Sequence, residues 1–201
     1  MPPVSRGFQR RRSPGADASR IPPGQYLTSD FPVLSAGPTP HTPLDEWSLT
    51  IDGAVDGSRR WSWSEFLALP SETFTVDIHC VTKWSRLDMT WTGVAVDTLL
   101  ADVETSGDYV TAWSDGGYTT NVPLEDLAGG RGWVAHSYDG EPLEAQHGGP
   151  ARLLVPHLYF WKSAKWLRGL TLTVDDEPGF WENYGYNNYG DPWREQRYWG
   201  D

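Results

Sequence analysis

Short stretches in which apolar and polar residues alternate recur along this chain and predict strands. The clearest is FTVDIHC at 74–80, where every second residue is apolar. EWSLTIDG at 46–53 also alternates and ends on an Asp-Gly turn signal. Further strands are expected at 109–113, 118–122, 132–138, 152–155 and 170–174.

Two segments carry helix signals instead. SWSEFLALP at 62–70 places Ser62 three residues before Glu65, as in a capping box, and stops at Pro70. WTGVAVDTLLADV offers Thr92 as a cap and predicts a short helix from about 94 to 100. Both helices are short, so strands dominate the predicted structure.

These elements indicate an α+β fold with mixed, mainly antiparallel sheets and short helices. At 201 residues the chain can bury roughly 70% of its unfolded surface, so one domain over 22–201 is expected. Residues 1–21 are rich in Pro, Gly, Ser and Arg without periodicity, which predicts a disordered basic tail. The aromatic stretch 178–201 is too irregular for a long helix and too aromatic for disorder, and its Tyr and Trp residues are expected to form the entrance for a substrate.

The charge distribution limits the classes of molecule that this protein can bind. The net charge is −11, while the first twenty residues carry +4, so the body is strongly acidic. Such a body would repel nucleic acid and anionic membranes. No apolar run approaches the ~20 residues that span a bilayer. The paired arginines in QRRRSPGADASR have no apolar segment behind them, so a cytoplasmic location is favoured over twin-arginine export.

Cys80 is the only cysteine, which excludes a disulfide within the chain. A lone thiol at the end of an apolar strand face is usually a small buried hydrophobe. A Cys–His pair with His79 is disfavoured, because adjacent strand residues point to opposite faces. A thiolate bound to a soft metal is the third reading, with Lys83 close enough to balance its charge.

The second chemical feature is a concentration of cations in HGGPARLLVPHLYFWKSAKWLRG at 147–169. Two of the three lysines, Lys162 and Lys165, fall here beside Arg152 and Arg168. An arginine fork, a lysine and the Ser163 hydroxyl together can hold a phosphate. A solvated charged loop is the competing interpretation, and composition alone does not separate the two.

The third feature is an aromatic excess of twelve tryptophans and nine tyrosines. Most are expected in the core, although Trp-rich chains also stack carbohydrate or line deep pockets. The sequence contains no P-loop, GxGxxG or GxSxG motif. A Trp-rich ligand-binding module is therefore the alternative to an enzyme.

Four blocks in order, HCVTKWS, WTGV, HGGPARLLVP and KSAKWL, resemble the molybdopterin-binding domain of the sulfite oxidase family. The resemblance is nearest to small bacterial members and to the catalytic subunit of the protein-methionine-sulfoxide reductase. It runs from about Pro22 to the C-terminus. It implies a molybdenum-molybdopterin cofactor and the family fold.

The resemblance assigns roles to individual residues. Cys80 matches the cysteine whose thiolate binds molybdenum, and His147 matches a polar pterin contact. Arg152 matches an arginine at the phosphate end of the cofactor. Ser163, Ala164 and Lys165 match the block that holds the phosphate by hydroxyl, backbone and ammonium. Asp115 or Ser114 matches a further pterin contact, and an N-terminal contact is expected among Tyr26, Thr28 and Phe31, of which we select Thr28.

The chain also departs from its relatives. Thr82 occupies the position at which reductase-like members carry an acidic residue, and at Lys83 the sequence differs from that of the sulfite oxidases. We assign Lys83 a catalytic role, in which its positive charge attracts an anionic substrate. Arg86 is a second candidate for this role. The side chains that grip sulfite have no clear counterpart. No segment is assignable to a haem domain, so electrons are expected to go to or come from a separate haem or flavin protein. The chain is expected to be a monomer.

These inferences predict a mononuclear molybdenum oxidoreductase performing two-electron oxygen-atom transfer on a small substrate, either a sulfite-like anion or a sulfoxide. The protein anchors the cofactor and the cofactor carries the redox chemistry. A reductase that uses the Cys80 thiol directly is disfavoured, because no resolving cysteine exists.

Overall fold

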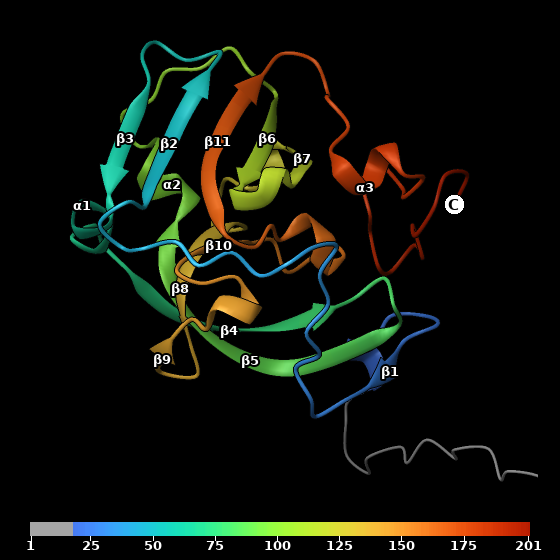
Figure 1. Ribbon diagram of the computed structural model, residues 1–201. Helices are drawn as coiled ribbons and strands as arrows, with labels where there is room; N and C mark the ends of the chain where they lie inside the picture. The colour runs from blue at the N-terminus through green and yellow to red at the C-terminus, as the bar shows by residue number, and fades with distance from the viewer. Residues whose placement is uncertain (1–17) are drawn as a thin grey trace, which may run out of the picture.

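The computed structural model describes residues 18–201 and places two sheets against each other (Figure 1). In the first sheet β1, β5, β8 and β10 follow in order, with β4 beside β5 and β9 beside β8. In the second the order is β3-β2-β11-β6-β7. The strands of the first sheet are β1 (Tyr26–Leu27), β4 (Glu72–His79), β5 (Trp84–Ala95), β8 (Trp133–Tyr138), β9 (Glu141–Pro142) and β10 (Arg152–Leu154). Those of the second are β2 (Ser48–Gly53), β3 (Arg59–Ser62), β6 (Tyr109–Ser114), β7 (Thr119–Pro123) and β11 (Leu167–Thr173).

Helices are short and connect the strands. The predicted capping box is confirmed, because the Ser62 hydroxyl accepts from the Glu65 amide while the Glu65 carboxylate accepts from the Ser62 amide at the start of α1. The α-helices are α1 (Trp63–Leu67), α2 (Val96–Leu100) and α3 (Phe180–Asn183). Single 3-10 turns are η1 (Ala18–Arg20), η2 (Asp115–Gly117), η3 (Leu124–Asp126), η4 (Ala145–His147) and η5 (Phe160–Lys162).

The pairing confirms the predicted α+β class and its antiparallel character. Seven of the nine strand pairs among residues 18–201 are antiparallel, and β1–β5 and β11–β2 are parallel. Each strand predicted from alternation is present within a few residues of its expected bounds. The two parallel pairs join segments that are distant in sequence, which no local pattern reports.

The helix predicted from about 94 to 100 is present as α2 but begins at Val96, because Gly93–Ala95 belong to β5 and pair with Trp133–Ala135 of β8. The prediction of Thr92 as its cap was wrong, since Ala95 precedes the helix and no side chain caps it. Gly93 permits this approach, since a Cβ there would lie 2.6 Å from the Val134 carbonyl oxygen. Strand β5 itself, the longest in the fold, was not predicted. Asp88 in its middle takes a left-handed conformation with φ 56°, and a register shift in the β4 pairing interrupts the alternation.

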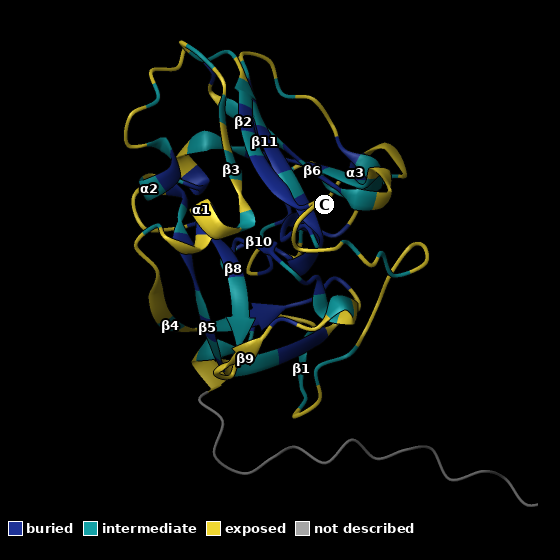
Figure 2. Cartoon of the chain, turned by 60° about the vertical axis from the view of Figure 1, so that its left-hand side comes forward, coloured by how far each residue is buried: buried dark blue, intermediate teal, exposed yellow. Residues whose placement is uncertain are grey.

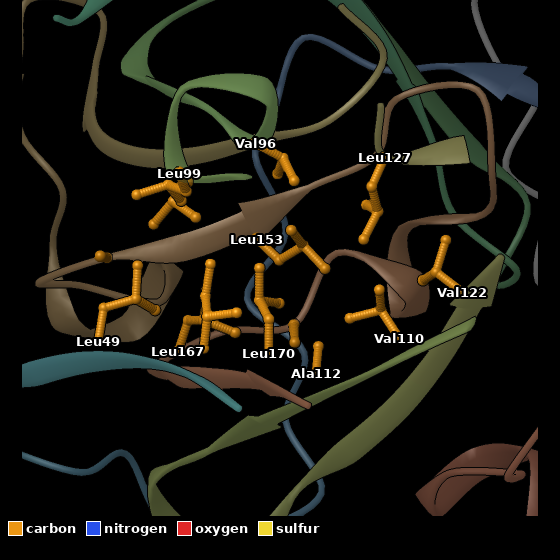
Figure 3. Packing of buried hydrophobic residues seen from close by; sticks show 14 of the residues in the cluster. Leu49, Val96, Leu99, Val110, Ala112, Val122, Leu127, Leu153, Leu167 and Leu170 are labelled. Carbon is orange, nitrogen blue, oxygen red and sulfur yellow. The ribbon is translucent and has the colours of Figure 1, made fainter. Parts of the chain in front are cut away.

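Two clusters of buried side chains lie on opposite faces of β8 and β10. Val134 and Leu153 join the larger cluster beneath the second sheet, while Ala135 and Leu154 join the smaller one around Cys80. Figure 3 shows Leu153 among the leucines and valines of the larger cluster, and Figure 2 shows buried residues concentrated on β2 and β11. Arg152 shares the face of Leu154, so strand periodicity directs it toward the aromatic cluster.

At the N-terminal end, residues 1–17 of the predicted tail lie outside the described residues. The remaining part is packed on the fold, since the Arg20 guanidinium bridges Asp77 and Asp88, each at 2.6 Å. The C-terminal stretch wraps beside α3 and ends near it (Figure 1). None of the helices within residues 18–201 is long and apolar enough to cross a bilayer.

Candidate active site

A cavity of about 720 Å³ is lined by segments far apart in sequence. The extended segment 31–40 lies along it, and residues 80–82, Trp84 and residues 115–118 form further parts of its wall. Aromatic side chains dominate the lining, and its arginine and lysine side chains are those of Arg152 and Lys165. Such a volume is typical of a site that encloses a cofactor or small ligand.

Cys80 lies directly after β4, with 7% of its surface exposed, and its side chain reaches this cavity. The Thr82 hydroxyl donates a hydrogen bond to the Cys80 sulfur at 3.1 Å. Burial raises the pKa of the thiol, while the Thr82 hydroxyl and amide and the charge of Arg197 act against that rise. Burial outweighs these groups, so the pKa of the Cys80 thiol stays above its ordinary value although three neighbouring groups act in favour of a thiolate.

The loop that carries Cys80 is held from both ends of the chain. Gln25 donates to the carbonyls of Cys80 at 3.1 Å and Trp84 at 2.9 Å. Arg197, which is 6% exposed, donates to the Val81 carbonyl at 2.8 Å and to the Gln25 side-chain oxygen at 2.9 Å. The sulfur is therefore positioned by a completed backbone network.

Arg152 lies in the cavity wall with 1% of its surface exposed. Its guanidinium donates to the carbonyls of His147 and Ser163, both at 2.7 Å, and lies 4.1 Å from the centre of the Phe160 ring. Burial lowers its pKa to about 9. The residue predicted five positions after His147 therefore contacts that residue's backbone.

Lys165 also faces the cavity, and its ammonium donates to the carbonyls of Leu34 and Gln146, both at 2.8 Å. Burial and the nearby charge of Arg152 lower its pKa to about 8. The Ser163 hydroxyl reaches the same cavity while accepting from the Val155 amide at 2.9 Å. Ala164 lies outside the lining, and its carbonyl accepts from the Leu153 amide.

The charged side chains of this part of the cavity wall are suited to an anionic group. Within residues 18–201 no carboxylate lies within ion-pair distance of Arg152 or Lys165, and each lowers the pKa of His147 in addition to burial. Buried cations without counter-charge are costly. A phosphate beside Ser163 would supply that charge, so the residues present fit the phosphate of a molybdopterin.

The pterin part finds a matching partner. The indole Nε1 of Trp84, a cavity-lining residue, is buried and has no hydrogen-bond partner among the described residues. A flat heterocycle in the cavity would find aromatic rings to stack on, since Phe31, Trp84 and Trp161 line it. The metal of the cofactor would need a soft ligand, and the Cys80 sulfur in the cavity wall is of this type.

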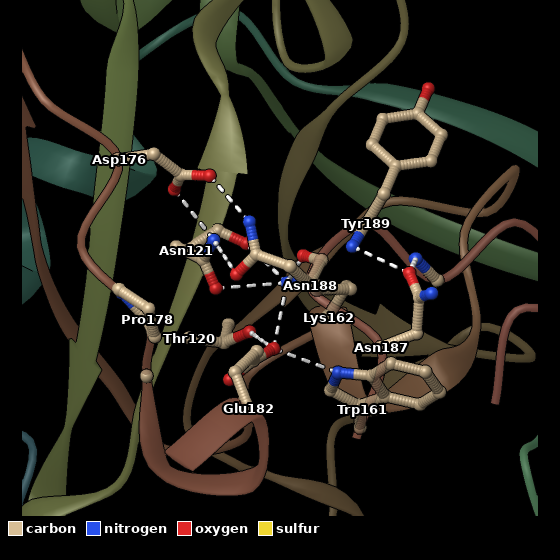
Figure 4. A network of polar contacts seen from close by, with 12 residues as sticks. Thr120, Asn121, Trp161, Lys162, Asp176, Pro178, Glu182, Asn187, Asn188 and Tyr189 are labelled. Carbon is tan, nitrogen blue, oxygen red and sulfur yellow. Dashed lines mark hydrogen bonds and ion pairs between the residues drawn. The ribbon is translucent and has the colours of Figure 1, made fainter. Parts of the chain in front are cut away.

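The cationic cluster predicted from composition divides in space. Lys162 is 1% exposed and points away from the cavity, where it pairs with Glu182 at 2.7 Å and donates to Asn121 and Asn188 (Figure 4). Arg168 pairs with Asp115 at 3.1 Å. Only Arg152 and Lys165 of the four are left to bind a ligand in the cavity.

Three further predicted residues lie around this wall. The ring of His147 stacks on Phe31, with centroids 3.9 Å apart, although His147 is outside the cavity lining. Asp115 lines the cavity but its carboxylate is engaged by Arg168 and Thr42. Thr28 lies outside the lining and its hydroxyl accepts from the Asp30 amide, so Phe31 is the N-terminal candidate that reaches the cavity. A cofactor contact by Thr28 stays a prediction.

Lys83 occupies the turn between β4 and β5 with φ 77°. Its side chain is exposed and does not line the cavity. The catalytic role predicted for it stays a prediction. The guanidinium of Arg86 lies over the rings of Phe31 and Tyr138, at 5.9 and 5.6 Å from their centres.

The sequence relationships agree with this geometry. Residues 36–181 match the family model described as the oxidoreductase molybdopterin binding domain. The chain belongs to this molybdopterin-binding oxidoreductase family. The matched range includes Cys80, Arg152 and Lys165, whereas Gln25 and Arg197, which hold the Cys80 turn, lie outside it.

Relatives within the family cover much of the chain. The uncharacterized oxidoreductase YuiH of Bacillus subtilis (strain 168) is 44% identical over 184 residues, covering 90% of this chain and 93% of that protein. The protein-methionine-sulfoxide reductase catalytic subunit MsrP of Pseudomonas syringae pv. tomato is 26% identical, covering 79% of this chain and 52% of that protein. The sulfane dehydrogenase SoxCD of Paracoccus pantotrophus shares the fold, with a TM-score of 0.63 at 22% identity over 69% of this chain and 41% of that one.

Aromatic residues form one part of the cavity wall. Trp181 and Tyr186 belong to the aromatic C-terminal stretch and line the cavity, with their rings stacked at 5.0 Å. Trp161 lines it as well, outside that stretch. Sequence reasoning missed Trp161 and Arg197, and nothing local marks Arg197 as a partner of residue 81.

Proposed function

We propose that this protein is a mononuclear molybdenum enzyme that transfers an oxygen atom in a two-electron reaction. One observation carries the proposal: the Cys80 sulfur and the cations Arg152 and Lys165 open into a single cavity, although more than seventy residues separate them in sequence. A soft metal ligand and a phosphate site in one space are what a metal-bearing molybdopterin requires.

The residues divide the work of holding this cofactor. Arg152, Lys165 and the Ser163 hydroxyl would bind its phosphate, and the Cys80 thiolate would bind the metal. When bound, the cofactor supplies the two-electron redox chemistry. The chain fixes the sulfur through the Gln25 and Arg197 contacts and limits the entry of water with the aromatic wall.

The lining favours a neutral substrate of the sulfoxide type over an oxyanion. Arg152 and Lys165 are the arginine and lysine side chains of the cavity, and both are assigned to the phosphate. The remaining wall includes Trp161, Trp181 and Tyr186, which suit apolar substituents flanking a polar oxygen. A sulfoxide would take up two electrons and two protons and leave as a sulfide and water. The name of the relative MsrP agrees with this substrate class.

The electrons would come from a separate haem or flavin protein, with the enzyme acting as a monomer. The described residues contain no second redox-active cysteine, since Cys80 is the sole one in the chain. Single-turnover oxidation of the reduced enzyme by a sulfoxide, without any partner, would separate the oxygen-atom transfer from the electron supply.

The deciding experiment is expression of the full chain in a host that makes molybdopterin. We expect about one molybdenum atom per chain, thiolate and dithiolene absorption in the visible, and reduction of a methyl sulfoxide by dye-reduced enzyme. Cys80→Ser should retain the fold and lose turnover, with an altered Mo(V) resonance. A colourless, metal-free protein from that host would instead support a Trp-rich ligand-binding module.

A control separates substrate classes. Sulfite oxidation and sulfoxide reduction are measured on the same molybdenum-loaded sample, with dyes as electron acceptor or donor. Faster turnover of sulfite than of any sulfoxide would overturn the substrate assignment and leave the metal assignment intact.

A further inference from the structure

The turn from Cys80 to Trp84 has a defined backbone. The Lys83 amide donates to the Cys80 carbonyl and the Cys80 amide donates to the Trp84 carbonyl, both at 2.9 Å. Lys83 takes the left-handed conformation that closes such a turn. Together with the Gln25 and Arg197 contacts, this geometry fixes the position of Thr82 relative to the Cys80 sulfur.

Thr82 directs its side chain at the sulfur although it lies at the surface of the turn. The hydroxyl donates to Sγ at 3.1 Å, and Thr82 also lines the cavity. No other hydrogen bond of this hydroxyl occurs within residues 18–201. A β-branched side chain has few χ1 rotamers, so the fixed turn holds this direction. A thiolate can only accept, so this bond persists when the sulfur binds a metal.

We propose that Thr82 is a positioning residue that sets the reduction potential of the metal through its hydrogen bond to the Cys80 sulfur. A donor to a ligating sulfur withdraws electron density from it, which weakens its donation to the metal and favours the reduced state. The amides of Val81 and Thr82 and the charge of Arg197 act on the sulfur in the same sense. Thr82 adds the only side-chain hydroxyl to this group, which makes its effect separable by substitution.

The inference rests on the proposed function, and its substitutions are chosen to isolate the hydroxyl. Thr82→Val keeps the branched shape and removes the donor, whereas Thr82→Ser keeps the donor. Thr75→Val is the matched control, because Thr75 is an exposed threonine of β4 whose hydroxyl bonds to Thr90 at 3.1 Å and not to the sulfur.

The measurement is a potentiometric titration of the molybdenum-loaded full-length protein, followed by the Mo(V) resonance. We expect the midpoint potential of Thr82→Val to shift to more negative values with a changed Mo(V) spectrum, while Thr82→Ser and Thr75→Val match the wild type. Molybdenum content is measured on every sample, so that potentials are compared between equally loaded proteins.

The outcomes separate the two proposals. Equal midpoint potentials for loaded wild type and Thr82→Val would overturn the role of Thr82 and leave the proposed function standing. A shift in Thr82→Ser as large as that in Thr82→Val would also overturn it, since the hydroxyl would then not be the cause. Wild-type protein without bound molybdenum would remove the proposed function and this inference together.

Discussion

The two ends of the cavity differ in how far the chain completes their interactions. At the sulfur end, four of the five backbone carbonyls of residues 80–84 accept hydrogen bonds, including those from Gln25 and Arg197. At the phosphate end, Arg152 and Lys165 are held by carbonyl oxygens, and no carboxylate of residues 18–201 lies within ion-pair distance. The chain satisfies most backbone groups at the first end, where the buried Nε1 of Trp84 has no partner among residues 18–201, whereas the second end holds two cations without counter-charge.

This difference separates stability from cofactor retention. Removing a contact at the sulfur end leaves buried carbonyls without donors, so the folded state is penalised. Removing a cation at the phosphate end also takes donors from carbonyls, but this loss is offset because a positive charge without counter-charge is removed, and an anion loses its partner. Substitutions at the two ends should therefore be distinguishable in the apoprotein.

The largest expected effect contrasts two neighbouring lysines. Lys162→Met should lower the free energy of unfolding by about 3–5 kcal/mol, because it leaves the buried Glu182 without its ion-pair partner. Lys165→Met should leave the apoprotein near wild-type stability while reducing the cofactor recovered after purification. Denaturant unfolding of the apoprotein and molybdopterin analysis of the loaded protein measure the two effects.

A double variant provides the control for Lys162. Replacing both members in Lys162→Met/Glu182→Leu removes the stranded charge and should recover part of the lost stability. If Lys165→Met destabilised the apoprotein as strongly as Lys162→Met, the interactions of Lys165 within the chain would matter as much for stability as the Lys162–Glu182 pair. The proposed difference between the two ends of the cavity would then be wrong.

Arg197 tests the sulfur end with a smaller effect. Arg197→Met leaves the Val81 carbonyl and the Gln25 side chain without their donor, which should cost about 1–3 kcal/mol in unfolding free energy. Arg194→Met, at an exposed position three residues earlier, should change little. Equal losses in the two variants would mean that Arg197 does not hold the turn.

The pH dependence of the apoprotein tests the phosphate end. Burial lowers the pKa of Lys165 to about 8 in the folded state from its ordinary value of 10.5, so the unfolded chain binds more protons between these pH values. Its contribution to stability therefore rises as pH increases across that interval. Lys165→Met should remove this part of the slope, as seen by unfolding curves at both ends of the interval. If the slope of stability against pH were the same in Lys165→Met as in the wild type, Lys165 would not be a cation that lacks counter-charge in the folded apoprotein.

The smallest expected effect concerns Lys83. Its left-handed backbone favours glycine, so Lys83→Gly should stabilise the fold by at most about 1 kcal/mol. The predicted catalytic role is tested on the same variant, because unchanged kcat and KM would exclude it. Lys83→Asn, which keeps a side chain that tolerates this conformation, is the matched control.

Much of the architecture followed from local pattern. The alternation at 74–80 and the Ser62 capping box predicted β4 and α1 because strand and helix periodicity are properties of neighbouring residues. Strand β5 was missed, since a residue with positive φ and a register shift break its alternation. The start of α2 was misplaced because pairing with β8 overrode a local helix signal.

The candidate site shows the same division. Residue chemistry and the order of the sequence blocks were enough to select Cys80, Arg152 and Lys165, since a thiol and clustered cations are visible in any conformation. Which lysine faces the cavity was set by packing: Lys162, the last residue of η5, pairs with Glu182, whereas Lys165, three residues later, lines the cavity. Burial and counter-charge depend on contacts across the whole chain, so no local pattern encodes them.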